Sequence, residues 1–266
     1  MLKRLLIISL LAMFVLSCSG RRPKETMSAK ERLTYAMKKF KNGDYLDAKT
    51  EFRVIVLNFP GQSVVDTAQF YLAECHLKMK EYILAAAEYE KLIRMFPASK
   101  FTDDAQYKIG YANYELSPKY SLDQTYTLKA IDELQRFAEE YPTSDLVNEA
   151  NKLMLKCREK LAKKEYKTGE LYRKMSYYEA AILYFESVLS NYYDTDYAED
   201  AQFWLAECLR KDRDYGRAVE EYAKYLQKYP NSNRKSQVQA LLKDAQRSKE
   251  ATGTSSDGMK EETASN

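Results

Sequence analysis

Four cysteines and a single histidine are the residues of this chain whose types could bind a metal ion or perform redox chemistry. Cys75 precedes His76 in the stretch DTAQFYLAECHLKMKEY, and Cys208 has the same place in the similar stretch EDAQFWLAECLRKDRDY. Thiolates and imidazoles are common zinc ligands, and two thiols can form a disulfide. The similarity of the two stretches also allows another interpretation, in which the cysteine marks one position of an internal repeat.

The positions of these residues argue against a shared metal or redox site. Three cysteines each lie nine residues after the polar residue that opens the same motif: Asp66 before Cys75, Asn148 before Cys157 and Glu199 before Cys208. Equivalent positions in different stacked repeats lie too far apart to form one shared site. A free cysteine commonly packs as a small buried hydrophobic residue. Because His76 is the only histidine, a zinc site would lack a second imidazole. We therefore expect these three cysteines to pack between helices, with no metal bound.

Other patterns of catalysis or nucleic-acid binding are also missing from the sequence. It contains no glycine-rich phosphate loop and no G-x-S-x-G motif. The formal net charge of +3 over 266 residues includes Lys3 and Arg4 of the N-terminal segment, so the rest is nearly neutral. Such a balance gives no support to nucleic-acid binding. We expect no enzyme activity and no cofactor, and an enzyme with an unrecognised site is the weakest alternative.

The fourth cysteine ends an apolar N-terminal run. Residues 5–16 are apolar, too few to span a bilayer but suited to a secretory signal. The run leads into Val15-Leu16-Ser17-Cys18, which resembles the lipobox of bacterial lipoproteins. This resemblance implies that residues 1–17 are a signal peptide and that the thiol of Cys18 is acylated. The alternative is an ordinary signal peptide with an incidental cysteine.

The residues after Cys18 predict where the lipid anchor would hold the protein. Two or three acyl chains would bind a membrane firmly. Ser19, rather than aspartate, follows the cysteine, which resembles the sorting rule for the outer membrane of Gram-negative bacteria. Residues 18–28 are then the lipidated cysteine and a flexible tether. We expect a protein that is lipid-anchored to the outer membrane and faces the periplasm.

A repeated pattern of alanine, an aromatic or leucine four residues later, and often a proline beyond predicts the fold. Five matches are centred on Ala48, Ala85, Ala130, Ala181 and Ala218. The alanine allows a neighbouring helix to approach, and the larger residue one turn later fills the space beside it. The pattern resembles the tetratricopeptide repeat, a helix-turn-helix unit. We predict an all-α, right-handed superhelical solenoid of about five such repeats.

The same pattern sets the predicted boundaries. Residues 144–174 contain no proline and predict one long helix joining repeats three and four, and SPKYSLDQTYT is an insertion between the helices of repeat three. We place the solenoid at residues 29–249, ending in a capping helix from 236. Residues 250–266 are polar and are predicted to be disordered.

The concave face of such a solenoid is where a partner would bind. Helix phase predicts that Phe70 and Glu74 of repeat two face this groove, with Glu207 in the equivalent place. The further candidates are Tyr107, Tyr111 and Tyr114 of repeat three, together with Thr67, Leu77, Asp104, Leu33, Met37 and Phe40. The three tyrosines form one stripe that would suit an extended peptide if exposed. The alternative is that they belong to the core between repeats.

The segment LAKKEYKTGELYRKMSYYEAAILYFESVLSNYYDT, with the lipobox and five repeats, resembles the BamD family. The matching positions are Leu161, Ala162, Lys163, Glu165, Tyr166, Gly169, Glu170, Tyr172, Ala180 and Ala181. The resemblance implies a periplasm-facing outer-membrane lipoprotein that works with BamA, a POTRA-bearing barrel protein, to receive and fold β-barrel precursors. N-terminal repeats would face substrate, and C-terminal repeats would dock the barrel partner.

The function expected from the sequence is therefore a non-enzymatic scaffold of the outer-membrane β-barrel assembly machinery. Its partners would be a BamA-like protein, unfolded outer-membrane protein segments, and the membrane through acylated Cys18, with no nucleic acid. One alternative is a periplasmic adaptor of the Tol–Pal coordinator type, which usually carries an N-terminal coiled coil and an unlipidated signal. Another is a carbohydrate-uptake lipoprotein with helical repeats, which is usually longer and richer in tryptophan.

Overall fold

The computed structural model describes residues 27–263, so the predicted signal peptide 1–17 and Cys18 lie outside the described residues. Within the described range the chain forms eleven helices and no strand. The helices are α2 (Ala29–Lys41), α3 (Tyr45–Asn58), α4 (Val65–Lys78), α5 (Tyr82–Met95), α6 (Thr102–Leu116), α7 (Thr125–Glu140), α8 (Val147–Lys174), α9 (Tyr178–Asn191), α10 (Tyr197–Lys211), α11 (Tyr215–Lys228) and α12 (Lys235–Thr263). The prediction of an all-α fold built from five helix-turn-helix repeats is confirmed.

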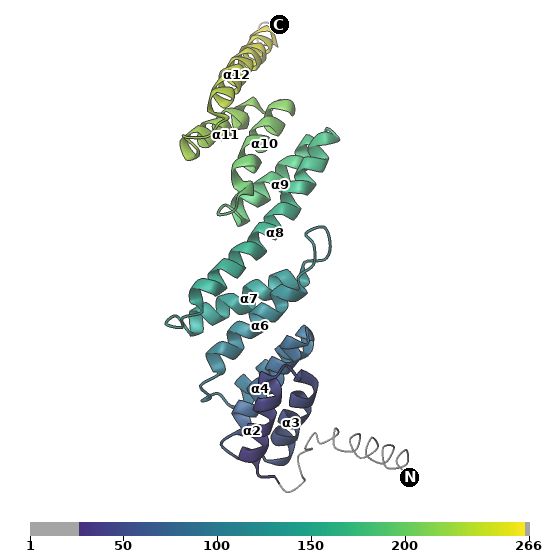
Figure 1. Cartoon of the computed structure of the whole chain (residues 1–266). Coiled ribbons are helices and arrows are strands. Elements are labelled where there is room, and N and C mark those ends of the chain that lie inside the picture. Colours follow the sequence, from purple (N-terminus) through teal and green to yellow (C-terminus); the bar gives the residue numbers. More distant parts are fainter. Residues whose placement is uncertain (1–26, 264–266) are drawn as a thin grey trace, which may run out of the picture. The chain divides into compact units, whose positions relative to one another are not determined.

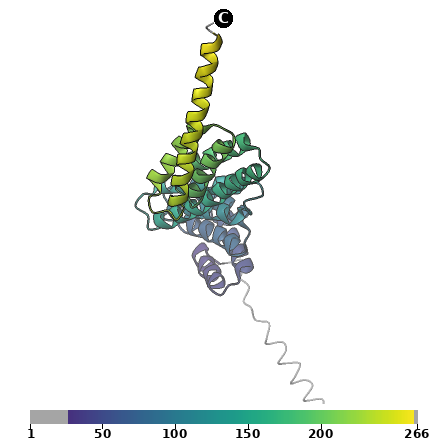
Figure 2. The same ribbon diagram turned by 90° about the horizontal axis from the view of Figure 1, so that it is seen from above.

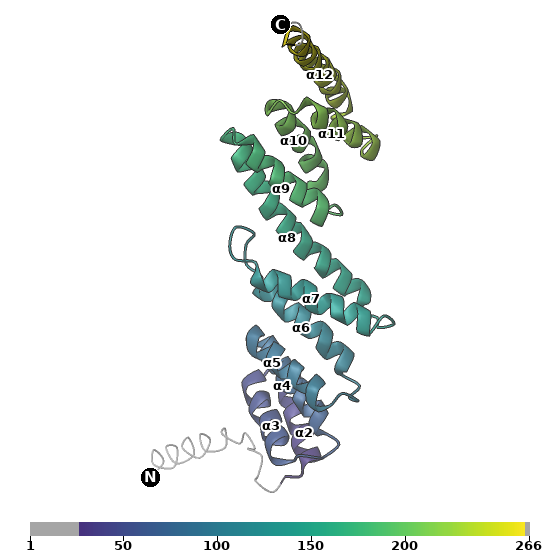
Figure 3. The ribbon, with the colours of Figure 1, turned by 180° about the vertical axis from the view of Figure 1, so that it is seen from behind.

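The chain divides between Thr102 and Asp103 into two compact units. The described part of the first unit contains α2 to α5, and each helix packs on the next (Figure 3). Its core includes Phe52, Ile55 and Leu72, with Cys75 among them. The aromatic rings of Phe52 and Tyr71 stack here with centroids 5.7 Å apart. This packing joins the two hairpins α2–α3 and α4–α5 through one shared core.

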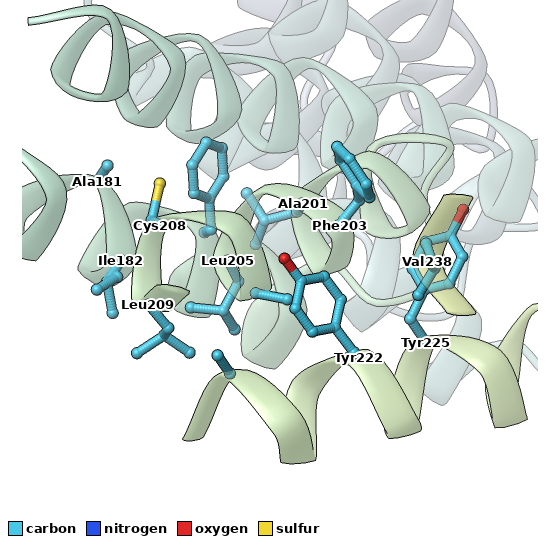
Figure 4. Close-up of a cluster of buried hydrophobic side chains, with 14 of the residues drawn as sticks. Ala181, Ile182, Ala201, Phe203, Leu205, Cys208, Leu209, Tyr222, Tyr225 and Val238 are labelled. Carbon is cyan, nitrogen blue, oxygen red and sulfur yellow. The ribbon is translucent and has the colours of Figure 1, made fainter. Parts of the chain in front are cut away.

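The second unit contains most of α6 and all of α7 to α12. Its long helix α8 forms a hairpin with α9 and also contacts α7 and α10 of the neighbouring hairpins (Figure 1). One core cluster joins α6, α7 and α8 through Tyr107, Leu134 and Leu153. A larger cluster extends from Tyr166 of α8 to Ala245 of α12. Figure 4 shows part of this cluster, in which side chains of α9, α10 and α11 meet.

The repeat alanines occupy the positions that the sequence predicts for them. Ala48, Ala85, Ala130, Ala181 and Ala218 are all fully buried in the second helix of their hairpins. The residues four positions later are also fully buried: Phe52, Tyr89, Leu134, Phe185 and Tyr222. A small buried side chain such as that of alanine lets the two helices of a hairpin approach closely. The larger side chain one turn later fills the adjoining space. The spacing in the sequence is therefore a packing pattern.

Four of the five hairpins turn through a residue with left-handed backbone geometry. This residue lies two positions before the second helix, with φ of 84° at Gly43, 60° at Lys80, 62° at Ser176 and 69° at Arg213. The residue that follows donates its N–H to a carbonyl five positions back, as when Asp44 N–H bonds to Lys39 O at 3.0 Å. This is the bond of a Schellman motif, which satisfies the last carbonyls of a helix. The turn of α6–α7 instead contains the predicted insertion.

Helix α12 is longer than the sequence predicts, because it runs from Lys235 to Thr263 and passes residue 249 (Figure 2, yellow). Its first turns pack on α11, with Val238 and Ala245 buried. The polar composition of residues 250–263 indicated disorder, but this stretch contains no proline to end the helix. The boundary placed at residue 249 is thus not the end of the helix.

Candidate functional site

The glutamates beside the repeat cysteines turn toward the interior of their own hairpins. Glu74 is only 8% exposed and accepts a hydrogen bond from the hydroxyl of buried Tyr89 in α5. Glu207 accepts the same bond from Tyr222 in α11, and Arg210 donates its Nε–H to Glu207 Oε1 at 3.1 Å. Burial, and then the bond to Glu207, raise the pKa of Tyr222 above its usual range. Each carboxylate thus helps to join the two helices of a hairpin.

A repeated glutamine, which sequence reasoning missed, joins the two helices of these hairpins at a second point and also joins α6 to α7. The amide nitrogen of Gln69 donates to the backbone carbonyl and to the carboxylate of Glu88, both at 2.8 Å. Gln106 binds the Glu133 carboxylate at 2.8 Å, and Gln202 binds that of Glu221 at 2.6 Å. The available signal was the dipeptide Ala-Gln, which recurs at all three places in the first helix of a hairpin. A buried amide with a charge-assisted bond stabilises one pairing of the two helices.

The first-unit groove candidate Phe70 is buried against another ring. Its ring stacks on Phe101 with centroids 4.5 Å apart and planes 13° from parallel. The neighbouring Tyr71 meets Phe70 edge-on at 5.5 Å. Of the other candidates in α4, Leu77 is buried and Thr67 is half-buried. Leu33, Met37 and Phe40 of α2 are partly buried and pack on the core of the first unit.

The tyrosine stripe of α6 lies at the edge of a core cluster. Tyr107 is 7% exposed, and its ring meets Phe137 edge-on at 5.6 Å. Burial raises the pKa of Tyr107 above its ordinary value. Tyr111 and Tyr114 are half-buried and pack against the same cluster. The structure therefore places Tyr107 in the core, whereas the rings of Tyr111 and Tyr114 are partly accessible to a partner.

The three repeat cysteines are buried and unpaired, as their positions predict. Burial raises the pKa of Cys75 and of Cys208 to about 12, and that of Cys157 to about 11. A thiol is reactive as its thiolate, so these side chains are poor nucleophiles and poor metal ligands near neutral pH. They pack as small hydrophobic residues.

His76 forms part of a charged contact between helices of the first unit. Its Nδ1 lies 2.5 Å from Glu81 Oε2, and Lys49 Nζ lies 3.2 Å from the same oxygen. The bond to His76 is the main reason that the pKa of Glu81 is lowered. Among residues 27–263, histidine, cysteine and carboxylate side chains form no cluster of three or more that could hold a metal ion. The contact of His76 with Glu81 joins the last turn of α4 to the residue before α5.

The helix hairpins, each with a buried alanine in its second helix, define a tetratricopeptide-repeat protein. Residues 200–232, which contain most of α10 and all of α11, match the model of a tetratricopeptide repeat family. Residues 25–211 match the model of the YfiO family, described as outer membrane lipoprotein. Because that match covers more than half of the sequence, the chain belongs to this family, which is the BamD family that the sequence resembles.

Several solved structures are similar to this chain at low sequence identity. The TPR2AB-domain:pHSP90 complex of yeast Sti1 has 18% identity and a TM-score of 0.43, covering 88% of this chain and 95% of that chain. A thermophilic TPR protein of Thermus thermophilus has 17% identity and a TM-score of 0.35, covering 82% and 98%. A tetratricopeptide repeat protein of Parabacteroides merdae has 14% identity and a TM-score of 0.36, covering 85% and 79%. With these scores, none of the three supports an argument about function.

Comparison with curated proteins gave no match. Within residues 27–263, no helix combines the length and the apolar character needed to cross a bilayer.

Proposed function

We propose that the protein is a non-enzymatic, lipid-anchored scaffold of the outer-membrane β-barrel assembly machinery that faces the periplasm. The observation that carries this proposal is the family match over residues 25–211, together with five helix hairpins in the described chain. Stacked helical repeats present extended surfaces for other proteins, and the buried, protonated cysteines offer no nucleophile. Binding of partners is therefore the activity that this fold supports best.

The proposed mechanism is a local increase in concentration. Acylated Cys18 would hold the scaffold at the membrane, and the repeats would bind a barrel precursor beside the POTRA-bearing subunit that inserts it. Tethering two binding events to one molecule raises the effective concentration of each partner for the other. No covalent step is required.

The predicted groove residues have different roles in this proposal. Tyr111 and Tyr114 are partly accessible, and their rings offer flat contact area with a hydroxyl that can bond to a peptide backbone. We propose these two rings as precursor contacts. Phe70, Glu74 and Tyr107 would then support the surface from within, because each is buried against residues of its own unit.

A pull-down from the native envelope tests the proposal. The full-length protein, solubilised in mild detergent, is expected to co-purify a large barrel protein that carries POTRA domains, and mass spectrometry would identify it. Recovery of Tol–Pal components without that barrel protein would contradict the proposal and favour the adaptor alternative. A matched pull-down with an unrelated outer-membrane lipoprotein controls for co-solubilisation.

A further inference from the structure

A cavity of about 710 Å³ opens beside the middle of α8, within the second unit. Three segments line it: the inserted loop between α6 and α7, one face of α8, and the start of α10. The residues that matter for its chemistry are Lys119 and Tyr120, Lys156, Glu159 and Lys163, and Asp196. Cavities of this volume are typical of sites for small molecules or short peptide segments.

The cavity is lined by more positive than negative charge. Lys156, Lys160 and Lys163 lie on one face of α8, because residues three and four apart share a helix face. Lys119 of the loop adds a fourth ammonium, against the two carboxylates of Glu159 and Asp196. In the described part of the chain none of the four lysines forms an ion pair, whereas Lys49, Lys167 and Lys224 elsewhere each do. This concentration of ammonium groups without ion pairs favours an anionic ligand.

The loop that forms one wall is held in place by several hydrogen bonds. Gln124 is 6% exposed, and its amide nitrogen donates to Lys119 O at 2.9 Å and to Leu122 O at 3.0 Å. From α8, Lys160 Nζ lies 2.5 Å from Ser117 Oγ, and Lys164 Nζ donates to Leu122 O at 2.9 Å. A ligand that binds a loop already ordered in this way loses less free energy to conformational entropy. This loop is therefore already ordered before a ligand binds.

Aromatic rings lie beside the ammonium groups. Lys163 Nζ is 4.9 Å from the ring centroid of Tyr120, and Lys160 Nζ is 5.8 Å from that of Tyr114. Tyr197 at the start of α10 also lines the cavity. Flat rings next to cations can contact the side chains and backbone of a peptide while the cations bind its carboxylates.

We infer that this cavity binds an extended, acidic peptide segment of another protein. Its carboxylates would lie between Lys119, Lys156 and Lys163, and its backbone N–H groups would donate to Glu159 or Asp196. A compact phosphate fits less well, because the same two carboxylates repel a dense negative charge. The inference does not depend on the proposed role in barrel assembly.

The test measures binding of a short fluorescein-labelled peptide of alternating glutamate and tyrosine to the full-length protein by fluorescence anisotropy. We expect Lys119→Ala with Lys156→Ala to weaken binding about tenfold, with the loss shrinking at high salt. The control is Lys235→Ala with Lys243→Ala, which removes the same charge at exposed positions of α12 that do not line the cavity. Circular dichroism checks that both variants keep their helix content.

Three results would overturn the inference. The first is equal affinity for the same peptide with glutamine in place of glutamate. The second is an equal loss in the control variant, which would indicate a general charge effect. The third is binding of inorganic phosphate, or of vesicles containing phosphatidylglycerol, that depends on Lys119 and Lys156 while the peptide does not bind.

Discussion

Gly110, inside α6, is a position at which a single added methyl group would meet the core. A Cβ added at Gly110 in α6 would lie 2.6 Å from Leu134 Cγ and 3.2 Å from its backbone nitrogen. Leu134 is fully buried in α7, so it has little room to move. Gly110 is therefore what allows α6 to approach α7 at this point.

We predict that Gly110→Ala lowers the free energy of unfolding by about 1–3 kcal/mol, the usual cost of overpacking a core. Urea denaturation followed by circular dichroism measures the change. Gly216→Ala in α11 is the matched control, since the nearest atom to its added Cβ is Asp214 Oδ1 at 3.8 Å. That variant should be neutral or more stable by up to about 1 kcal/mol. A stable Gly110→Ala protein would show that the two helices can separate without cost.

The residues of the candidate site differ in how far the sequence reveals them. Spacing alone places the repeat alanines, because a buried small residue one turn from an aromatic has a recognisable period. Helix phase places Glu74 and Glu207 on a face, but it does not reveal that each binds a buried tyrosine hydroxyl. The role of Gln124 is hidden, because its amide nitrogen donates to backbone carbonyls, which every residue carries.

At the scale of elements, the hairpins differ in how well the residue at the left-handed turn suits that backbone conformation. Gly43 adopts φ of 84° without steric cost, whereas Arg213 adopts φ of 69° in the equivalent turn. A residue with a Cβ is destabilised by about 1 kcal/mol or more in this region of backbone space. The α2–α3 hairpin thus has glycine, the residue suited to this turn, and the three others have a residue with a Cβ.

We predict opposite effects for two exchanges at this position. Gly43→Ala should destabilise the protein by about 1 kcal/mol, and since nothing lies within 4 Å of the added Cβ the loss would come from the backbone alone. Arg213→Gly should stabilise it by a few tenths to about 1 kcal/mol, because the strain at the turn is relieved. Thermal and urea unfolding of both variants measure the changes. Destabilisation by Arg213→Gly would contradict this account and assign a role to the arginine side chain.

Elements of this kind are well predicted where the pattern repeats and poorly where it is interrupted. The hairpins and the long helix α8 follow from periodicity and from the missing prolines. The insertion between α6 and α7 was recognised only as an interruption of the pattern. Its ordered form depends on Lys160 and Lys164, which are about forty residues away in the chain. Bonds between such distant residues leave no short-range signal.

At the scale of the whole molecule, attachment to the membrane is expected to depend on one thiol. We predict that Cys18→Ala releases the protein into the soluble periplasmic fraction, because the proposed acyl chains would supply most of the membrane affinity. Fractionation of cells followed by immunoblotting measures the distribution. Ser19→Ala, which leaves Cys18 in place, should remain with the outer membrane. Retention of Cys18→Ala in the membrane of cells without the barrel partner would contradict the anchor.

Helix α8 sets the rotational phase of the second unit. It is 28 residues long and is packed by α7 near one end and by α9 and α10 farther along. A loop can absorb an added residue, but a continuous helix turns everything beyond it by about 100° for each residue inserted. We therefore expect insertions or deletions in α8 to be compatible with folding only when they add or remove close to a whole number of helical turns. The neighbouring loops can vary in length by single residues. Because α8 is continuous, its length fixes the angle by which the repeats at one end are rotated relative to those at the other.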